Sequence, residues 1–487
     1  MLKASAAKGA MTLGATRIVL NVVNVVALFV LARLLTPEDF GLVAICTTVL
    51  GIVVALTELS LGSALIQRRE VTRDHIDTAW TMAFTRALMI TAGFALLSHP
   101  IALLYGDLRL GPLFLVTGVT AAMTSLVNPN VAMRTKQMHF GPMMLMQIAQ
   151  KLLGLAISIV LALLWHNYWA IVTGTALGTA LSTLLSYIVV PYLPRFTLAR
   201  AKDLLGFSSW LFFAQLVNVV NWRFDQLLIG LFLPPAQLGL YAMSDNTAAI
   251  PSREMTAPIV QVLFPSFSTI QDNLERLRKA YLNAQTTIGL ASMPIGIGLA
   301  LVAEPVVHLA LGPQWLETVP LIEVIACSYA IQTLTSGSRS LAMARGQTRS
   351  LFMRDVAGLA LRVPCVCIGL AGWGLIGLIW GRMLSSVIGV FVTFGMVKKI
   401  LDVPISTQLW TQRRTLLSVA AMALAVKLAD HQMIALHVLP IIRIVLLVGI
   451  GGVTFIGTLG LLWAIEGRRP GPETELLGLA RGAIAKI

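Results

Sequence analysis

A cation and two amides share one face of the first apolar stretch of the sequence. Arg17, Asn21 and Asn24 follow one another at i, i+4 and i+7, a spacing that aligns side chains along one side of a helix. A guanidinium can hold phosphate oxygens with two parallel hydrogen bonds, and amides suit sugar hydroxyls. Because unsatisfied polar groups in hydrocarbon cost several kcal/mol, this face must meet protein or water. The pattern therefore predicts the lining of a polar cavity inside a membrane.

The chain repeats this polar face roughly two hundred residues later. The tetrapeptide Asn-Val-Val-Asn at 21–24 recurs letter for letter at 218–221. The matching face carries four residues: Gln215, Asn218, Trp222 and Asp225. Two polar helices in corresponding places of two halves predict a central cavity between two lobes, which is the plan of a transporter.

A proline-marked turn follows each copy of the polar helix. Pro37 and Gly41 in the first turn reappear as Pro235 and Gly239 in the second. Each turn leads into another apolar span, so the repeat covers a pair of helices rather than a single one. We expect the two pairs to form corresponding rigid hairpins on the outer side of the membrane.

Further ionisable residues lie within apolar spans. A charge near the bilayer centre costs about 2.5–3.5 kcal/mol on the insertion scale, so these residues must face partners or water. The substrate-binding candidates besides the two repeated faces are Lys151, Arg253, Gln332, Arg339 and Arg362. The carboxylates that could neutralise a cation or couple transport are Glu58, Asp225, Asp245 and Asp355. The surplus of cations over carboxylates suits a pyrophosphate.

Three of these candidates belong to two further single-face stripes, and several ionisable residues have structural alternatives. The stripes are Gln147, Lys151, Gly154 and Ser158, and Ser328, Gln332, Thr335 and Arg339. Arg86, Arg354 and Arg382 could equally extend to a membrane interface, and Asp225 could simply neutralise a nearby arginine. The small-residue pairs Gly174-xxx-Gly178 and Gly377-xxx-Gly381 indicate helix-packing seams rather than sites.

The composition defines the class of protein. Of the 487 residues, 57% are hydrophobic and only 12% are charged, which is typical of a polytopic membrane protein. The formal charge of +14 lies beside apolar spans, so we interpret it as a topology signal and expect no nucleic-acid binding. Cys46, Cys327, Cys365 and Cys367 all lie in apolar spans, which favours small buried hydrophobes over disulfides or metal ligands. We expect no cofactor and no metal site.

The expected fold is all-α, with about fourteen transmembrane helices. Loops alternate between basic and nearly uncharged, which places both termini in the cytoplasm. Residues 1–199 and 200–402 form two pseudo-symmetric six-helix lobes in one orientation, and 403–487 add two helices and a tail. A separate amphipathic surface helix is expected at 274–281. The spans are expected near 10–35, 40–66, 77–98, 110–131, 142–165, 169–192, 205–232, 237–264, 284–303, 317–338, 351–371, 374–397, 413–429 and 438–464.

The first turn carries a family resemblance. The stretch from Arg33 to Gly41, RLLTPEDFG, resembles the first-turn signature of bacterial Wzx-type polysaccharide flippases. The second half repeats the likeness in Leu238-Gly-Leu-Tyr241, in the segment from Phe264 to Ser268, and in the helix that follows it. These flippases belong to the multidrug/oligosaccharidyl-lipid/polysaccharide exporter superfamily, which also holds lipid II flippases and multidrug extruders.

The resemblance implies a function that the residues alone do not specify. It implies alternating-access movement of undecaprenyl-pyrophosphate-linked oligosaccharide from the cytoplasmic to the periplasmic leaflet of the inner membrane, for exopolysaccharide, capsule or O-antigen synthesis. Implied partners are membrane lipids, a polysaccharide polymerase, a chain-length regulator and a coupling cation, H⁺ or Na⁺. One alternative is a multidrug extruder of the same superfamily. The other is a membrane polysaccharide polymerase or glycosyltransferase. No nucleotide-binding or metalloprotease motif and no long catalytic loop is present, so we expect a protein that is not an enzyme.

Overall fold

The computed structural model describes residues 19–58, 61–62, 65, 70–137, 139–201, 209–436 and 438–467, and of residues 209–216 only the backbone. Every regular element in these ranges is a helix, as expected for an all-α membrane protein. Nine of the described helices or helix groups are long and apolar enough to cross a membrane. The chain divides into two compact units, Met1–Leu240 and Tyr241–Ile487, which are described separately.

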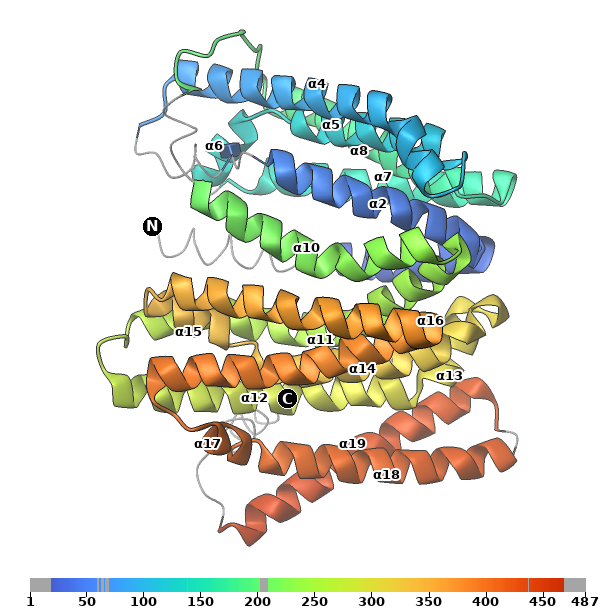
Figure 1. Ribbon diagram of the computed structural model, residues 1–487, viewed down its shortest axis with the longest axis vertical. Helices are drawn as coiled ribbons and strands as arrows, with labels where there is room; N and C mark the ends of the chain where they lie inside the picture. The colour runs from blue at the N-terminus through green and yellow to red at the C-terminus, as the bar shows by residue number, and fades with distance from the viewer. Residues whose placement is uncertain are drawn as a thin grey trace, which may run out of the picture. The chain divides into compact units, whose positions relative to one another are not determined.

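The first unit is a group of long helices around α2 and α5 (Figure 1). α10 packs against α2, α4 packs against α5, and α8 packs against both α5 and α7. The described helices are Val19–Leu34, α2 (Pro37–Thr57), α4 (Arg73–Leu104), α5 (Leu110–Ser125), α6 (Asn130–Lys136), α7 (Gly141–Trp165), α8 (Trp169–Val189) and α10 (Ser209–Phe232).

The first proline-marked turn is a complete helix start. Pro37 occupies the first position of α2, where a backbone N–H would have no acceptor within the helix, so proline loses no hydrogen bond there. The Thr36 N–H donates to the Asp39 carboxylate over 3.0 Å, and the Asp39 N–H donates to the Thr36 hydroxyl over 3.3 Å. The second carboxylate oxygen of Asp39 accepts the Tyr168 N–H over 2.9 Å, which ties the start of α2 to the start of α8. The predicted turn is therefore confirmed, and the Asp39 carboxylate holds it in place through its hydrogen bonds to Thr36 and Tyr168.

The start of α2 is also held by the loop between α4 and α5. The Arg109 guanidinium lies 2.6 Å from the Glu38 carboxylate and 2.7 Å from the Asp107 carboxylate. The hydrogen bonds from Arg109 hold the pKa of Asp107 below its usual range, against the opposing effect of partial burial. These three charges form an ion-pair network at the same end of the unit as the first turn.

Small residues bring α7 and α8 together. A Cβ atom on Gly174 would lie 2.0 Å from the Ser158 hydroxyl, and one on Gly178 would lie 2.6 Å from the Gln150 carbonyl oxygen. Gly154 faces the Gly174 carbonyl across the same contact. The predicted packing seam is confirmed, and it also accounts for Gly154 and Ser158 in the stripe that runs from Gln147.

The second unit consists of long helices joined by short irregular turns (Figure 1). α12 packs against α14 and α18, α14 packs against α16, and α18 packs against α19. Its elements are α11 (Pro235–Ser268, which begins in the first unit), α12 (Leu274–Leu301), α13 (Ala303–Val306), a π turn (Val307–Leu311), a 3₁₀ turn (Pro313–Thr318), α14 (Val319–Gln332), a 3₁₀ turn (Thr333–Thr335), α15 (Ser338–Ala344), α16 (Thr348–Leu401), α17 (Ile405–Trp410), α18 (Arg413–Ala435) and α19 (Pro440–Ile465).

α16 is two spans joined by a sharp turn. Trp373 and Gly374 leave the helical conformation, and Gly374 has a φ of 59°, which favours glycine. The two arms then pack closely, because a Cβ on Gly377 would lie 2.1 Å from the Gly369 carbonyl oxygen. The second small-residue pair, Gly377 and Gly381, is therefore a packing seam as predicted. With α16 counted as two arms, each predicted span overlaps a described helix or helix group. Residues 10–18, 59–60, 63–64, 66 and 205–208 of the predicted spans lie outside the described residues.

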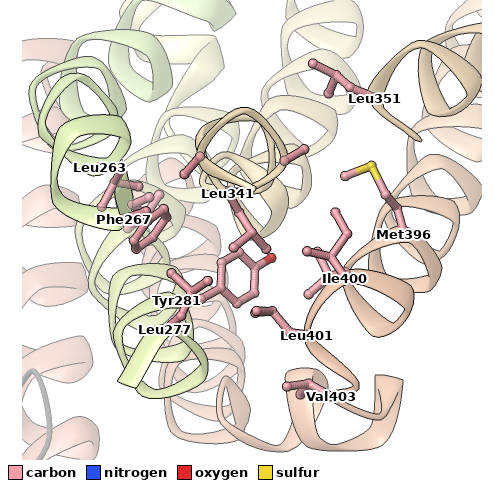
Figure 2. Close-up of a cluster of buried hydrophobic side chains, with 14 residues drawn as sticks. Leu263, Phe267, Leu277, Tyr281, Leu341, Leu351, Met396, Ile400, Leu401 and Val403 are labelled. Atoms are coloured by element: carbon pink, nitrogen blue, oxygen red, sulfur yellow. The ribbon is translucent and has the colours of Figure 1, made fainter. Parts of the chain in front are cut away.

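The expectation of a separate surface helix at 274–281 is wrong. This segment is the beginning of α12, which runs without interruption from Leu274 to Leu301. Leu277 and Tyr281 are buried in an apolar cluster with Leu263 and Ile400 (Figure 2). The amphipathic pattern is real, but its apolar face meets the protein core instead of the membrane surface.

Candidate functional site

The first predicted polar face is only partly described. Arg17 lies outside the described residues, and the side chain of Gln215 is likewise not described. On the helix Val19–Leu34, Asn21 is half-buried and Asn24 is exposed. This helix face therefore remains a prediction for the substrate contact.

The second polar face divides between two surroundings. Asn218 is half-buried, Trp222 is 53% exposed, and Asp225 is completely buried in the first unit. The sequence places Trp222 and Asp225 on one helix face, yet only Asp225 turns into the protein. This burial gives Asp225 a place in the packing of α10 and favours the interpretation that it neutralises a charge there.

Polar side chains also join α10 to α2. The Gln226 amide oxygen accepts the Thr48 hydroxyl over 2.8 Å and an N–H of Arg223 over 2.8 Å. A Cβ on Gly51 would lie 3.2 Å from Nε of Arg223, so the absence of a side chain there leaves room for the guanidinium. Arg223 is thus fixed in the helix contact.

Glu58 pairs with Arg86. The Arg86 guanidinium lies 3.1 Å from the Glu58 carboxylate, and it also donates to the Val54 carbonyl and the Thr57 hydroxyl, each over 3.2 Å. The Arg86 side chain is 13% exposed, whereas that of Glu58 is 40% exposed. Glu58 is therefore a charge partner, as its residue type predicts, and its partner is on α4.

The second unit contains a buried charged centre, formed by Tyr241, Asp245, Tyr329 and Arg382. Arg382 lies 2.7 Å from the Asp245 carboxylate and donates a hydrogen bond to the Tyr241 hydroxyl. The same carboxylate oxygen accepts the Tyr329 hydroxyl over 2.8 Å. The guanidinium carbon lies 5.6 Å and 5.2 Å from the ring centroids of Tyr241 and Tyr329, within cation–π range.

Three helices position the charged centre. Tyr241 and Asp245 are one helical turn apart on α11, Tyr329 is on α14, and Arg382 is on the second arm of α16. Arginine stays protonated in proteins, so the centre contains a permanent cation. The Arg382 side chain is only 3% exposed and that of Asp245 is 23% exposed, so the carboxylate side is the less buried side of the centre.

The sequence predicted Asp245 as a charge partner but did not identify the other three members. The alternative that Arg382 extends to a membrane interface is excluded by its burial. A signal was present, because Arg382 directly follows Gly381 of the packing seam, and an arginine beside a helix contact must find a buried partner. The partner itself could not be found from spacing, since α14 and α11 are far apart in the sequence.

The remaining candidates are not brought together into one site. Gln332 donates to the Ser386 hydroxyl over 3.1 Å, which joins α14 to α16. The stripe from Ser328 to Arg339 does not form one helix face, because α14 ends at Gln332 and a 3₁₀ turn follows. Arg253 pairs with Glu254 over 3.3 Å, and Asp355 pairs with Arg354. Lys151 and Arg339 are exposed, and Arg362 is half-buried.

A family model described as "Polysaccharide biosynthesis protein" matches residues 30–320. The chain is 24% identical to the lipopolysaccharide biosynthesis protein WzxC of Escherichia coli (strain K12) over 387 residues, 78% of each chain. It is also 24% identical to the succinoglycan biosynthesis transport protein ExoT of Rhizobium meliloti (strain 1021) over 406 residues, 82% of each chain.

Solved structures share the fold. The lipid II flippase MurJ in an inward closed conformation has a TM-score of 0.76 at 14% identity, and the match covers 93% of this chain and 99% of that chain. An inward-facing multidrug resistance MATE family transporter of the MOP superfamily has a TM-score of 0.59 at 17% identity, with 81% and 94% covered. The helix arrangement is therefore one that membrane transporters use.

Proposed function

The chain belongs to the polysaccharide biosynthesis protein family, and from this premise we propose that it is a flippase for lipid-linked oligosaccharides. It is a multi-pass membrane transporter of the multidrug/oligosaccharidyl-lipid/polysaccharide exporter superfamily. Its proposed substrate is an undecaprenyl-pyrophosphate-linked repeat unit, which it would move from the cytoplasmic to the periplasmic leaflet of the inner membrane.

The observation that carries the proposal is the charged centre formed by Tyr241, Asp245, Tyr329 and Arg382. Removing two charges from water is costly, and a helix group that only needs to be stable can use apolar residues instead. An ion pair with two tyrosine partners inside an apolar helix group therefore indicates a role in transport rather than in stability alone. The carboxylate of Asp245 is our candidate for the coupling group, with H⁺ or Na⁺ as the coupling cation.

The substrate contacts belong to the same proposal. Arg17, with Asn21 and Asn24 on its face, is proposed to bind the pyrophosphate, because arginine holds phosphate oxygens in pairs and remains charged in a low dielectric. The exposed cations Lys151 and Arg339 are proposed as further contacts for the anionic headgroup. Amides such as Gln332 suit the sugar hydroxyls.

Transport is proposed to proceed by alternating access. Two lobes, 1–199 and 200–402, would rock about a site near the middle of the membrane, with both termini in the cytoplasm. α10 is the first helix of the proposed second lobe, and it packs on α2 of the first lobe. The contact between α10 and α2 would therefore have to change as the lobes rock. A polysaccharide polymerase and a chain-length regulator are the proposed downstream partners.

A deletion strain tests the function. Loss of the gene should leave lipid-linked repeat units facing the cytoplasm, and the wild-type chain should restore their appearance in the periplasm. A multidrug extruder would instead change drug efflux and leave the lipid-linked units correctly distributed. Normal export in the deletion strain, with no substitute flippase encoded, would rule out the proposal.

A further inference from the structure

Uncharged polar side chains are buried where α12 meets α17 and α18. Several of their amide and hydroxyl atoms have no hydrogen-bond partner within the described part of the chain. These atoms are both amide atoms of Gln285 and of Gln412, Oε1 of Gln408, Oγ1 of Thr415 and Oγ of Ser418. Each of the five residues is 2% exposed or less. We call this group the polar joint.

Two contacts place Gln285 in the middle of the polar joint. Tyr281 and Val403 belong to the apolar cluster of Figure 2. Two helical turns further along the same face of α12, a Cβ on Gly289 would lie 2.6 Å from Oε1 of Gln412. Gln285 is halfway between Tyr281 and Gly289, so it faces the chain between Val403 and Gln412.

Gln408 lies in that facing stretch, and its orientation is fixed. Its side-chain nitrogen donates to the Phe394 carbonyl over 3.1 Å and to the Val403 carbonyl over 3.1 Å. An amide that uses both N–H groups in this way has only its oxygen left. Gln408 therefore contributes an acceptor to the joint, while Gln285 and Gln412 each contribute a donor and an acceptor.

The mixture of donors and acceptors indicates the class of ligand. A cation would satisfy only the oxygen atoms and would leave the two amide N–H₂ groups unmatched. Arg413 and Arg414, which directly follow Gln412, add positive charge nearby and bind Glu466. A small neutral molecule that both donates and accepts matches both kinds of atom, and water is such a molecule.

We propose that the polar joint is an internal water-binding site that makes the contact between α12 and α18 separable. Wet polar surfaces part more readily than interlocked apolar ones, because water can replace each hydrogen bond as the surfaces separate. Further along α18, Val419, Met422 and Val426 belong to a buried apolar cluster with Met293 of α12. Separation would therefore begin at the α17 end of α18.

The opposite end of the hairpin formed by α18 and α19 is held to α13 by an ion pair. Arg443 on α19 lies 2.6 Å from Asp430 on α18 and 2.8 Å from Glu304 on α13. The same hairpin is closed at its other end by Glu466 with Arg413 and Arg414, which keeps its two helices together. The hairpin can thus pivot as one piece about Arg443, with the polar joint opening.

Cysteine labelling of the full-length protein in lipid nanodiscs tests this inference. All four native cysteines are first replaced, and Thr415→Cys is compared with Val426→Cys, which lies three turns further along the same helix face. A thiol reacts as thiolate, which requires water. We expect a small neutral methanethiosulfonate to label Thr415→Cys about tenfold faster than Val426→Cys. Equal rates would overturn the proposal.

A second set of variants shows whether the amides bring the water. Gln285→Leu combined with Gln412→Leu should lower labelling of Thr415→Cys to the rate of Val426→Cys, without lowering the thermal midpoint. Gln271→Leu, at an exposed position, is the matched control and should change neither quantity. A persistent tenfold difference in the double variant would count against a water site. If the double variant does not fold, Gln285→Leu alone must reduce labelling for the proposal to stand.

Discussion

Gly41 and Gly239 each lie against the turn that precedes the other. A Cβ on Gly41 would lie 1.8 Å from the Pro235 carbonyl oxygen, and a Cβ on Gly239 would lie 1.8 Å from the Pro37 carbonyl oxygen. The four residues are the corresponding positions of the sequence repeat, so the contact is reciprocal. The starts of α2 and α11 therefore cross with backbone against backbone, which only glycine at both positions permits.

This crossing predicts an unusually severe effect of a single methyl group. Gly41→Ala should destabilise the protein by about 1–3 kcal/mol, because its neighbour is backbone and cannot rotate away. Gly93→Ala on α4, with no atom within 4 Å of its Cβ, is the control and should be neutral or stabilising. Thermal unfolding of the purified protein measures both. Equal midpoints for the two variants would contradict the crossing.

The charged centre predicts non-additive substitutions. Asp245→Asn should cost about 3–5 kcal/mol, because it leaves the Arg382 charge buried without its carboxylate. Combining it with Arg382→Met should recover most of that loss, since no buried charge remains. A double-mutant cycle by thermal or chemical unfolding checks the coupling. If the double variant instead loses the sum of the two single losses, the substitutions act independently and the ion pair is not the source of the effect.

The transport activity of these variants separates structure from function. If Asp245 couples transport, the double variant Asp245→Asn with Arg382→Met should be stable and yet fail to export polysaccharide. Restored export in the double variant would limit Asp245 and Arg382 to a structural role. The matched comparison is Glu275→Gln, which removes a carboxylate from the exposed pair with Lys279 and should leave export intact.

How far the sequence determines the architecture is visible in particular residues. Pro37, Pro235 and the Trp373–Gly374 turn are local signals, because proline and glycine restrict or extend the backbone wherever they occur. The spans and packing seams could therefore be predicted. The partner of Arg382 could not be predicted, because it depends on which of many helices adjoin. The continuity of α12 could not be predicted either, because a basic amphipathic segment has the same pattern on a membrane surface and against a protein core.

Tyr281 predicts a stabilising substitution. Its hydroxyl is buried in the apolar cluster of Figure 2 and has no hydrogen-bond partner within the described part of the chain. Tyr281→Phe should therefore raise the thermal midpoint or leave it unchanged, because it removes a desolvated polar atom. Tyr329→Phe removes the hydrogen bond to Asp245 and should therefore lower the thermal midpoint, with a loss of about 1–3 kcal/mol in the free energy of unfolding. The opposite ranking of the two variants would refute this assignment.

Glu466 predicts a loss of stability in acid. Hydrogen bonds from Arg414, and then from Arg413, hold the pKa of its carboxyl below the usual value. A carboxyl with a lower pKa in the folded than in the unfolded state stabilises the fold above the unfolded value of about 4.3, and this contribution disappears as pH falls through the folded pKa. The thermal midpoint of the wild type should therefore fall more steeply below pH 4.3 than that of Glu466→Gln. Identical pH profiles would show that the contact carries no stability.

The proposed pyrophosphate contact predicts a graded series at Arg17. Arg17→Lys should retain partial export, because it keeps the charge but loses the paired hydrogen bonds, and Arg17→Ala should retain little. Arg276→Ala, at an exposed position on α12, is the control and should export normally. Complementation of the deletion strain at matched protein levels measures all three.

The competing explanation is that Arg17 only balances a buried carboxylate. Glu58 is a poor test of that idea, because its removal would also disturb Arg86, whereas Asp225 is completely buried and lies on the repeated face. If Arg17 were only a partner of Asp225, Asp225→Asn combined with Arg17→Ala should do less harm than Arg17→Ala alone, since an orphaned buried charge is the costly state. We expect no such rescue, because a missing phosphate contact cannot be supplied by removing a carboxylate elsewhere. Restored export in the double variant, or normal export by Arg17→Ala, would exclude a phosphate-binding role for Arg17.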